Sequence, residues 1–359
     1  MLYITLVENS AWMLEALSLA RLFDGRLDLR LVSSLEFLVL FLLMMLVMNA
    51  LELSGLLNSL GGRLVNRAGS ERKLALFLCL LVFFASALLT NDVVLLGIVP
   101  LTIVVGSAAD VKLKKLCIFE GIAANSGSLL TPFGNPQNIF ISVHYNVPLW
   151  DFILVMLPLW LVSLGLLLAL VYMQFGKREV RHIHKTGSDR TAAALGIAAL
   201  VVVILFFGRV LPTVIVAPAV LCLLLSTRKL GRILKLVDWK LYLLFVLMAL
   251  ATYALLRIYT LQLSGIALLI GSAGLSQAIS NVPAAFVLSG AANWRLLAIG
   301  VDIGGAGTLI SSVATVIAYR FIKRHDPETT IWEFMKWGAL FCAAQFLLML
   351  PVLLWMGLL

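Results

Sequence analysis

Apolar blocks of membrane-spanning length dominate this chain. Of its 359 residues, 62% are hydrophobic and 13% are charged, whereas soluble domains average about 45–50% apolar and about 25% charged residues. A helix needs about 20 apolar residues to cross the hydrocarbon of a bilayer. We therefore predict an all-α polytopic membrane protein. The blocks that reach or approach this length are Leu35–Leu51, Phe152–Phe175, Ala192–Gly208, Val210–Leu225, Leu241–Leu256 and Trp337–Leu359.

Two other apolar segments are followed by arms too short to cross. An arm of 14 helical residues rises about 21 Å and one of nine about 13 Å. Backbone that stops inside the membrane is tolerated where protein or water covers it. We therefore predict two re-entrant helical hairpins, one with its tip at Thr90–Asp92. The first hairpin comprises Lys73–Thr90 and Val93–Gly106; the second comprises Leu263–Ile279, the polar tip Ser280–Pro283 and Ala284–Ala292.

An interrupted apolar segment follows each hairpin. Asn125–Asn138 contains two prolines and two glycines inside the stretch Leu116–Ile141. Both residue types disfavour helix interiors. Asp302–Ser312 interrupts Ile299–Ala318 in the same way. We predict a broken transmembrane helix at each place.

The two interruptions align with each other without a gap. We call the spacing from Asn125 to Asp302 the break offset, and the spacing from Asn91 to Asn281 the tip offset. The tip offset is the larger, which fits the longer connection Ser107–Lys115 in the first half. Transporters built from inverted repeats show weak internal symmetry of this kind. The aligned pairs are Asn91 with Asn281, Asn125 with Asp302, Thr131 with Thr308, Gly134 with Ser311, and Asn135 with Ser312.

These features predict five parts of the chain. They are an amphipathic N-terminal segment 1–31, a first inverted repeat 32–176, a basic cytoplasmic loop 177–190, two linking helices 191–237, and a second inverted repeat 238–359.

The basic residues support this topology. If the first hairpin opens to the cytoplasm, 21 of the 27 Lys and Arg residues lie inside and six lie outside, as the positive-inside rule expects. The net charge of +9 then needs no nucleic acid partner. We predict a multi-pass protein of the inner (plasma) membrane, and we leave open whether residues 1–31 cross it.

Polar residues at the tips and breaks are the predicted substrate and ion site. Helix N-termini at mid-depth carry about half a positive charge and free N–H groups, which favour anions. The competing interpretation is that these residues only cap broken helices. The predicted set is Thr90, Asn91, Asp92, Asn125, Ser126, Gly127, Thr131, Gly134, Asn135, Asn138, Ser280, Asn281, Asp302, Gly305, Thr308, Ser311 and Ser312.

Three carboxylates lie in apolar surroundings, where a charge is costly and usually functional. Asp92 and Asp302 belong to opposite halves, and each is predicted to bind Na⁺ or to carry a proton. Glu120, just before the first break, is a possible proton site or a buried partner of an amide. No other cofactor is expected. The four cysteines lie in apolar stretches without metal-type spacing, so we predict that they are core residues: Cys79, Cys117, Cys222 and Cys342.

Four motifs together resemble the ion transporter superfamily. The nearest branch is that of arsenite permeases (ArsB) and sodium/proton antiporters (NhaD), and within it the YbiR-type anion permeases. The resemblance covers residues 32–359, and it implies re-entrant hairpins, a transport domain that moves against a scaffold, and a homodimer. This chain departs from the pattern at Asp302, where many relatives carry Asn. The motifs are Glu52–Gly55, Leu89–Val93, Asn125–Asn138 and Gly274–Pro283.

The function predicted is secondary active transport of a small inorganic or organic anion or oxyanion, coupled to Na⁺ or H⁺, by an elevator-like mechanism in the lipid bilayer. A cation/proton antiporter and an arsenite efflux permease are the alternatives, and a channel is a remote one. We do not expect an enzyme, because neither His-Glu-x-x-His nor Gly-x-Ser-x-Gly occurs. A nucleotide-binding P-loop is also missing, so ATP is not expected to drive transport.

Overall fold

A computed structural model describes residues 29–56, 59, 67–109, 111–132, 134–180, 188–207, 213–237, 239–240, 242–243, 246–247 and 261–359. In these residues the fold is helical, with one isolated bridge between Ser70 and Glu179. The predicted α class is therefore confirmed for this part of the chain. The segment 1–28 and most of the predicted span Leu241–Leu256 lie outside it.

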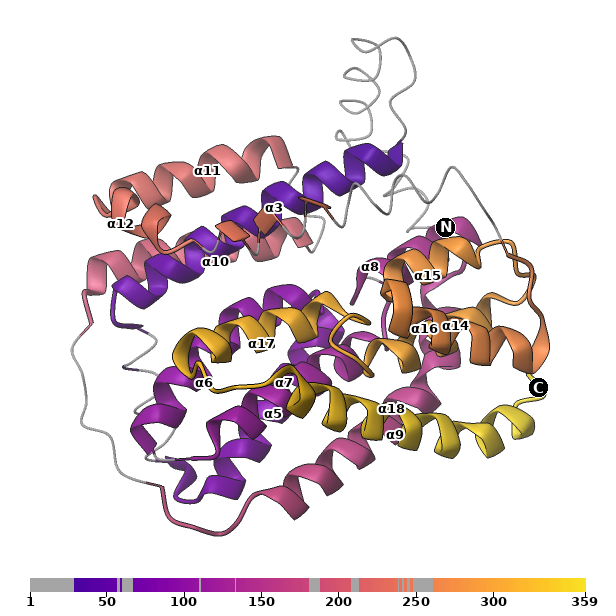
Figure 1. Ribbon diagram of the computed structural model, residues 1–359. Helices are drawn as coiled ribbons and strands as arrows, with labels where there is room; N and C mark the ends of the chain where they lie inside the picture. The colour runs from indigo at the N-terminus through magenta and orange to yellow at the C-terminus, as the bar shows by residue number, and fades with distance from the viewer. Residues whose placement is uncertain are drawn as a thin grey trace. The chain divides into compact units, whose positions relative to one another are not determined.

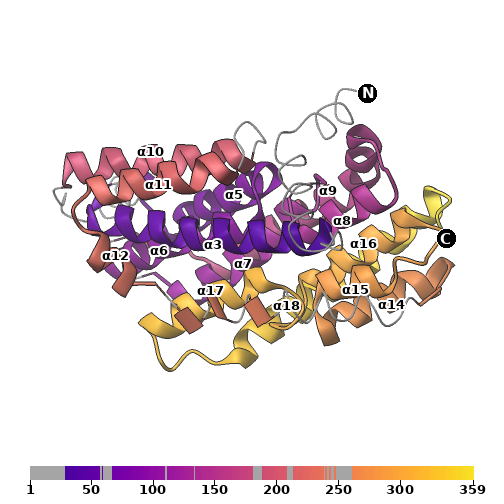
Figure 2. The same ribbon diagram turned by 90° about the horizontal axis from the view of Figure 1, so that it is seen from above.

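The chain forms two compact units. One comprises Met1–Leu56 and Ser188–Ala254, and the other comprises Leu57–Gly187 and Leu255–Leu359. In the first unit, α3 packs against three other helices (Figures 1 and 2). Asn49 of α3 donates a hydrogen bond from Nδ2 to the Ile233 carbonyl at 3.2 Å. The helices of this unit are α3 (Leu29–Leu53), α10 (Arg190–Phe207), α11 (Thr213–Ser226) and α12 (Leu230–Lys235).

The second unit contains the same succession of elements twice: two helices joined by a tight connection, an interrupted helix, and a long apolar helix. By length and composition, α9 and α18 are the two described helices that could each cross a membrane. The first series is α5 (Glu71–Leu88), α6 (Asn91–Ala109), α7 (Leu113–Ser128), α8 (Pro136–His144) and α9 (Leu149–Gln174). The second series is α14 (Gly265–Ile279), α15 (Asn281–Val287), α16 (Trp294–Gly305), α17 (Val313–His325) and α18 (Ile331–Trp355).

Helix boundaries repeat at the two offsets found in the sequence. The starts of α6 and α15 are separated by the tip offset. The ends of α7 and α16 are separated by the break offset, and so are the starts of α8 and α17. Both predicted breaks are therefore true helix interruptions. The inverted orientation of the two halves stays a prediction.

The second arm of the first hairpin is longer than expected. Helix α6 has 19 residues, which rise about 28 Å, whereas the predicted arm was Val93–Gly106. The helix starts earlier than expected because Asn91 and Asp92, which we expected in the tip, belong to it. Asparagine is favoured at the start of a helix. The length of α6 thus does not require re-entry. Helix α15, with seven residues, remains too short to cross.

The helices after the two breaks pack on the opposite halves. Helix α17 contacts α6 and α7, whereas α8 contacts α15 and α16 (Figure 1). Helices α9 and α18 also contact each other. This exchange brings both breaks into the interior of one unit.

Close helix packing recurs in both halves. A Cβ on Gly127 of α7 would lie 1.9 Å from the Phe83 carbonyl oxygen of α5. A Cβ on Gly304 of α16 would lie 2.7 Å from the Ala273 carbonyl oxygen of α14. The two glycines are separated by the break offset, and Phe83 and Ala273 by the tip offset. Both helix pairs therefore depend on a glycine at the same place.

Candidate functional site

Each hairpin tip is hydrogen-bonded to the break of its own half. The Asn91 backbone N–H donates to the Gly134 carbonyl at 3.0 Å, and the Asn281 N–H donates to the Ser311 carbonyl at 2.9 Å. In each half, the asparagine Oδ1 also accepts from the next backbone N–H at 2.9 Å. The residues that align in the sequence thus make the same bonds in the structure.

Asn125 joins the two halves. Its Oδ1 accepts hydrogen bonds from Asn91 Nδ2 at 3.0 Å and from Ser312 Oγ at 2.7 Å. Its Nδ2 donates to the Gly305 carbonyl and to Thr315 Oγ1, both at 3.1 Å. An amide has two acceptor sites and two donors, so its hydrogen-bonding capacity is used completely. The side chain, 6% exposed, fixes the first tip against the second break.

Asp302 is the centre of a second polar cluster. The residue is 4% exposed. Its Oδ1 accepts from Gln137 Nε2 at 2.8 Å and from Asn135 Nδ2 at 3.2 Å. In the described part of the chain, three oxygens of this cluster have no hydrogen-bond partner: Asp302 Oδ2, Gln137 Oε1 and Asn138 Oδ1. A buried group of unsatisfied oxygens is suited to a cation or a proton.

Asp92 is the second buried aspartate of the predicted site. It is buried in the first turn of α6. Its Oδ1 has no hydrogen-bond partner among the described residues, and the same holds for Thr90 Oγ1 and for Ser126 Oγ of α7. No described hydrogen bond joins Asp92 to Asp302. The predicted approach of the two aspartates to one centre therefore stays a prediction.

The remaining predicted residues brace the tips and breaks. Thr131 Oγ1 donates to the Ala87 carbonyl at 2.9 Å, which attaches the first break to the end of α5. Ser311 Oγ donates to the Thr308 carbonyl at 2.6 Å. Ser280 has a φ of +77°, a conformation that is costly for a residue with a side chain. Its Oγ lies 3.3 Å from the Ser311 carbonyl. Gly127 contributes close packing, and its carbonyl accepts a hydrogen bond from Trp160 Nε1 at 3.2 Å.

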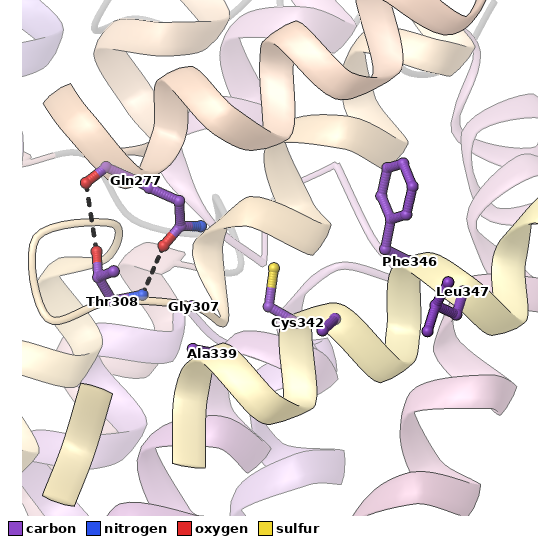
Figure 3. A pocket seen from close by; sticks show the side chains of 8 residues that line it. Gln277, Gly307, Thr308, Ala339, Cys342, Phe346 and Leu347 are labelled. Atoms are coloured by element: carbon purple, nitrogen blue, oxygen red, sulfur yellow. Dashed lines mark hydrogen bonds between the residues drawn. The ribbon is translucent and has the colours of Figure 1, made fainter. Parts of the chain in front are cut away.

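Gln277 and Gln137 make hydrogen bonds at the site that our sequence analysis did not predict. Gln137 lies inside the motif Asn125–Asn138 and Gln277 inside the motif Gly274–Pro283, but neither was in the predicted set. Gln277 Oε1 accepts from the Thr308 N–H at 2.7 Å, and Thr308 Oγ1 donates to the Gln277 carbonyl at 3.3 Å (Figure 3). The motif around Gln137 contains three amide side chains within four residues, which is the one signal that pointed to it.

A cavity of about 440 Å³ lies beside the second break, and neither Asn125 nor Asp302 lines it. Figure 3 shows its lining from α14, the break and α18. The lining atoms are almost all carbon, so this cavity is not the polar site. It is lined by Gln277, Gly307, Thr308, Ala339, Cys342, Ala343, Phe346 and Leu347.

Glu120 lies outside both clusters. It is fully buried in α7, and Thr102 Oγ1 of α6 donates to its Oε1 at 2.5 Å. Its partner is thus a hydroxyl, not the amide that we considered.

The cysteines are free thiols. Cys79 and Cys117 are buried as predicted and Cys342 is half-buried, but Cys222 is exposed on α11. That prediction was wrong because an apolar helix in a membrane protein also has a lipid-facing side. In the described residues, no group of three His, Cys, Asp or Glu side chains is placed to hold a metal ion.

Comparisons with known proteins agree with these features. A family model described as a citrate transporter, CitMHS, matches residues 11–294. The inner membrane protein YbiR of Escherichia coli is 33% identical over 331 residues, which cover 88% of this chain and 83% of YbiR. The uncharacterised transporter MJ0456 of Methanocaldococcus jannaschii is 35% identical over 259 residues, or 70% of this chain and 71% of that protein.

A shorter match is the silicon efflux transporter LSI3 of Oryza sativa, 29% identical over 133 residues, or 37% of this chain and 27% of that protein. With its apolar helices, the chain is a multi-pass membrane protein, and its relatives are transporters. The chain therefore belongs to the citrate transporter (CitMHS) family of the ion transporter superfamily.

Proposed function

We propose that this protein is a secondary active transporter of a small anion or oxyanion, coupled to Na⁺ or H⁺. The observation that supports this most strongly is the Asn125 amide, which is bonded at once to the first tip and to the second break. A site built from two halves at interrupted helices is what alternating access requires. The relatives' names, a citrate transporter family and a silicon efflux transporter, also favour acids and their anions.

Recognition of the anion is proposed to use backbone and amide donors. Helices α6, α8 and α17 all begin at a tip or a break, and their N-termini carry partial positive charge. Asn91, Asn125, Asn135 and Asn138 place buried amides at the same tips and breaks. A substrate that competes for these donors would replace hydrogen bonds within the site.

Coupling is proposed to depend on Asp92 and Asp302. A bound Na⁺ or proton neutralises the carboxylate and lets the loaded site move through the bilayer. An unloaded carboxylate resists that movement, because burying an unpaired charge costs several kcal/mol. The unpartnered oxygens beside Asp302 equally favour a cation/proton antiporter, which is the second candidate function. Arsenite efflux would be one case of the first candidate function, the transport of an anion or oxyanion.

An elevator-like movement is proposed from the distribution of the site. All the site residues belong to the second compact unit, and α3 and α10–α12 of the first unit contribute none. A unit that carries the whole site is suited to move as a transport domain against a scaffold. Re-entrant hairpins, inverted repeats and a homodimer complete the proposal, as the family resemblance implies.

Uptake into proteoliposomes tests the proposed function. The purified protein is reconstituted and offered labelled citrate, silicate and arsenite, with a Na⁺ gradient, a pH gradient or neither. We expect accumulation of at least one solute that depends on a gradient, and a raised melting temperature in its presence because a ligand of the native state stabilises it.

Variants of the two tips sharpen this test. Asn91→Ala and Asn281→Ala are expected to fold and to lose uptake, because both tips supply one site. Gly165→Ala is the control, since a Cβ at this position of α9 meets open space. Normal uptake by both tip variants would show that the tips only cap helices.

A further inference from the structure

Glu120 has an unusual environment for a carboxyl group. It is fully buried on α7, five residues before Asn125. Oε1 accepts a hydrogen bond from Thr102 Oγ1, with an O–O distance of 2.5 Å. Oε2 has no hydrogen-bond partner in the described part of the chain. One oxygen is therefore bonded and the other is free.

The groups around Glu120 are uncharged. The buried thiols of Cys79 on α5 and Cys117 on α7 lie close enough for Glu120 to act on them. An ionised carboxylate in this place would lack any compensating cation. The neutral acid leaves a single O–H without an acceptor, which is a smaller cost.

The residues beside Glu120 pack on aromatic and small residues of the neighbouring helices. The ring of Phe119 packs on Phe175, which follows α9, and on Trp337 of α18, with centroid distances of 5.9 and 5.4 Å. On the α17 side, Gly121 faces Ala318 and Thr315. These described contacts leave the carboxyl group in an apolar environment.

The second half shows that the fold does not need this pair. The position that aligns with Glu120 at the break offset is Leu297, and the position that aligns with Thr102 at the tip offset is Ala292. Helices α15 and α16, the counterparts of α6 and α7, still contact each other without it. Because the position of Glu120 is occupied by leucine in the second half, packing alone does not explain the acid.

We propose that Glu120 is a proton-binding site of the transporter and that Thr102 is its positioning residue. The proton is held on Oε2, while Thr102 orients the carboxyl group through Oε1. Release breaks the O–H bond and transfers the proton to water on the side to which the site opens. This inference rests on the proposed function for its coupling role, and it names H⁺ as a coupling ion.

Infrared spectroscopy of the purified protein tests proton binding without any substrate. The probe is the proton, and the readout is the carbonyl stretch of a protonated carboxylic acid at neutral pH. Glu120→Gln keeps the acceptor for Thr102 and removes the acid. We expect the wild-type protein to show a band that this variant lacks. A difference spectrum with only ionised carboxylate bands would overturn the proposal.

Thr102→Val covers the case in which Glu120→Gln does not fold. It retains the acid and removes its hydroxyl donor, so the band should persist and shift to higher frequency. Ser142→Ala is the matched control, because it removes a buried hydroxyl whose bond stays within α8, and its spectrum should match the wild type. An unshifted band in Thr102→Val would contradict the positioning role.

Transport separates this inference from the proposed function. For the solute that the wild-type protein accumulates, Glu120→Gln should retain exchange without a gradient and lose accumulation driven by a pH gradient. Unchanged pH-driven accumulation would refute the coupling role and leave the transporter proposal intact. If the wild-type protein moves no solute, the proposed function fails, while the infrared result still decides proton binding.

Discussion

The two halves of the second compact unit share their architecture and differ in their chemistry. Both join the hairpin tip to the break by the same backbone bond, and both bring a glycine against the backbone of the preceding hairpin. By contrast, Asn125 aligns with Asp302, and Glu120 aligns with Leu297. The shared positions stabilise the fold, whereas at the differing positions a carboxyl group in one half aligns with an amide or an apolar side chain in the other.

The largest effect on stability is expected at the two packing glycines, where the halves are most alike. Gly127→Ala would place a Cβ 1.9 Å from the Phe83 carbonyl oxygen, so α5 and α7 must separate. Overpacking costs about 1–3 kcal/mol and sometimes more, and this backbone clash should reach or exceed that range. Gly304→Ala, with a looser contact of 2.6 Å to Ser276 Cβ, should lower the melting temperature less.

Gly274→Ala in α14 is the control for both, because a Cβ there meets open space. Alanine is favoured over glycine inside a helix by about 1 kcal/mol, so this variant should melt at or above the wild-type temperature. Equal stability of Gly127→Ala and Gly274→Ala would contradict the shared packing.

The tip asparagines should differ in their contribution to stability. The Asn91 side chain bonds the next backbone N–H and also Asn125. The Asn281 side chain bonds the next N–H and the hydroxyl of Ser280. Each hydrogen bond is worth about 1 kcal/mol, so Asn91→Ala should lower the free energy of unfolding by up to about 2 kcal/mol. It should destabilise the protein more than Asn281→Ala does, because it also disconnects the halves. Thermal melts in detergent measure the difference, and a larger loss in Asn281→Ala would reverse the comparison.

The aspartates should affect coupling more than stability. Asp92→Asn and Asp302→Asn should permit substrate binding and lose accumulation driven by an ion gradient, since the neutral amide no longer needs a cation or proton to move. Asp302→Asn also makes the second half resemble the first at this position. Uptake with and without Na⁺ and pH gradients is the measurement. If both variants accumulate substrate with unchanged ion dependence, neither aspartate couples.

The smallest effect is expected at a surface contact between the halves. Lys114 Nζ lies 3.1 Å from Asp326 Oδ2, and both side chains are about one-third exposed. The hydrogen bond from Lys114 holds the pKa of Asp326 below its ordinary value. The pair therefore stabilises the fold above the ordinary pKa of aspartate, and this contribution is lost as the pH falls through the lowered pKa. Lys114→Gln should reduce the melting temperature slightly at neutral pH and not at strongly acidic pH; an equal reduction at both would contradict the ion pair.

The sequence predicted the elements of the fold more fully than their partners. Proline and glycine predicted the first break, glycine and polar residues predicted the second, and the offsets predicted that Asn91 and Asn281 play equivalent parts. The start of α6 was misplaced because Asn91 can either end a tip or open a helix. The exchange of α8 and α17 between halves leaves no local pattern, since it depends on contacts between distant segments.

The same limit applies to the site. Asn125 and Asp302 were predicted because polar residues inside apolar segments are costly. Gln137 and Thr102 were not, because their importance arises from partners 165 and 18 residues away. Without knowledge of its partner, a polar residue in a helix cannot be recognised from the sequence as part of a site.

Cysteine labelling from each side of the membrane tests most directly whether the two halves are inverted. Single cysteines are placed at Ala109, Ser188 and Ala292 in a background without the four native thiols. Opposed hairpins predict labelling of Ala109 and Ser188 from the cytoplasm and of Ala292 from outside. Labelling of Ala109 and Ala292 from the same side, or of Ala109 and Ser188 from opposite sides, would contradict the inverted repeats.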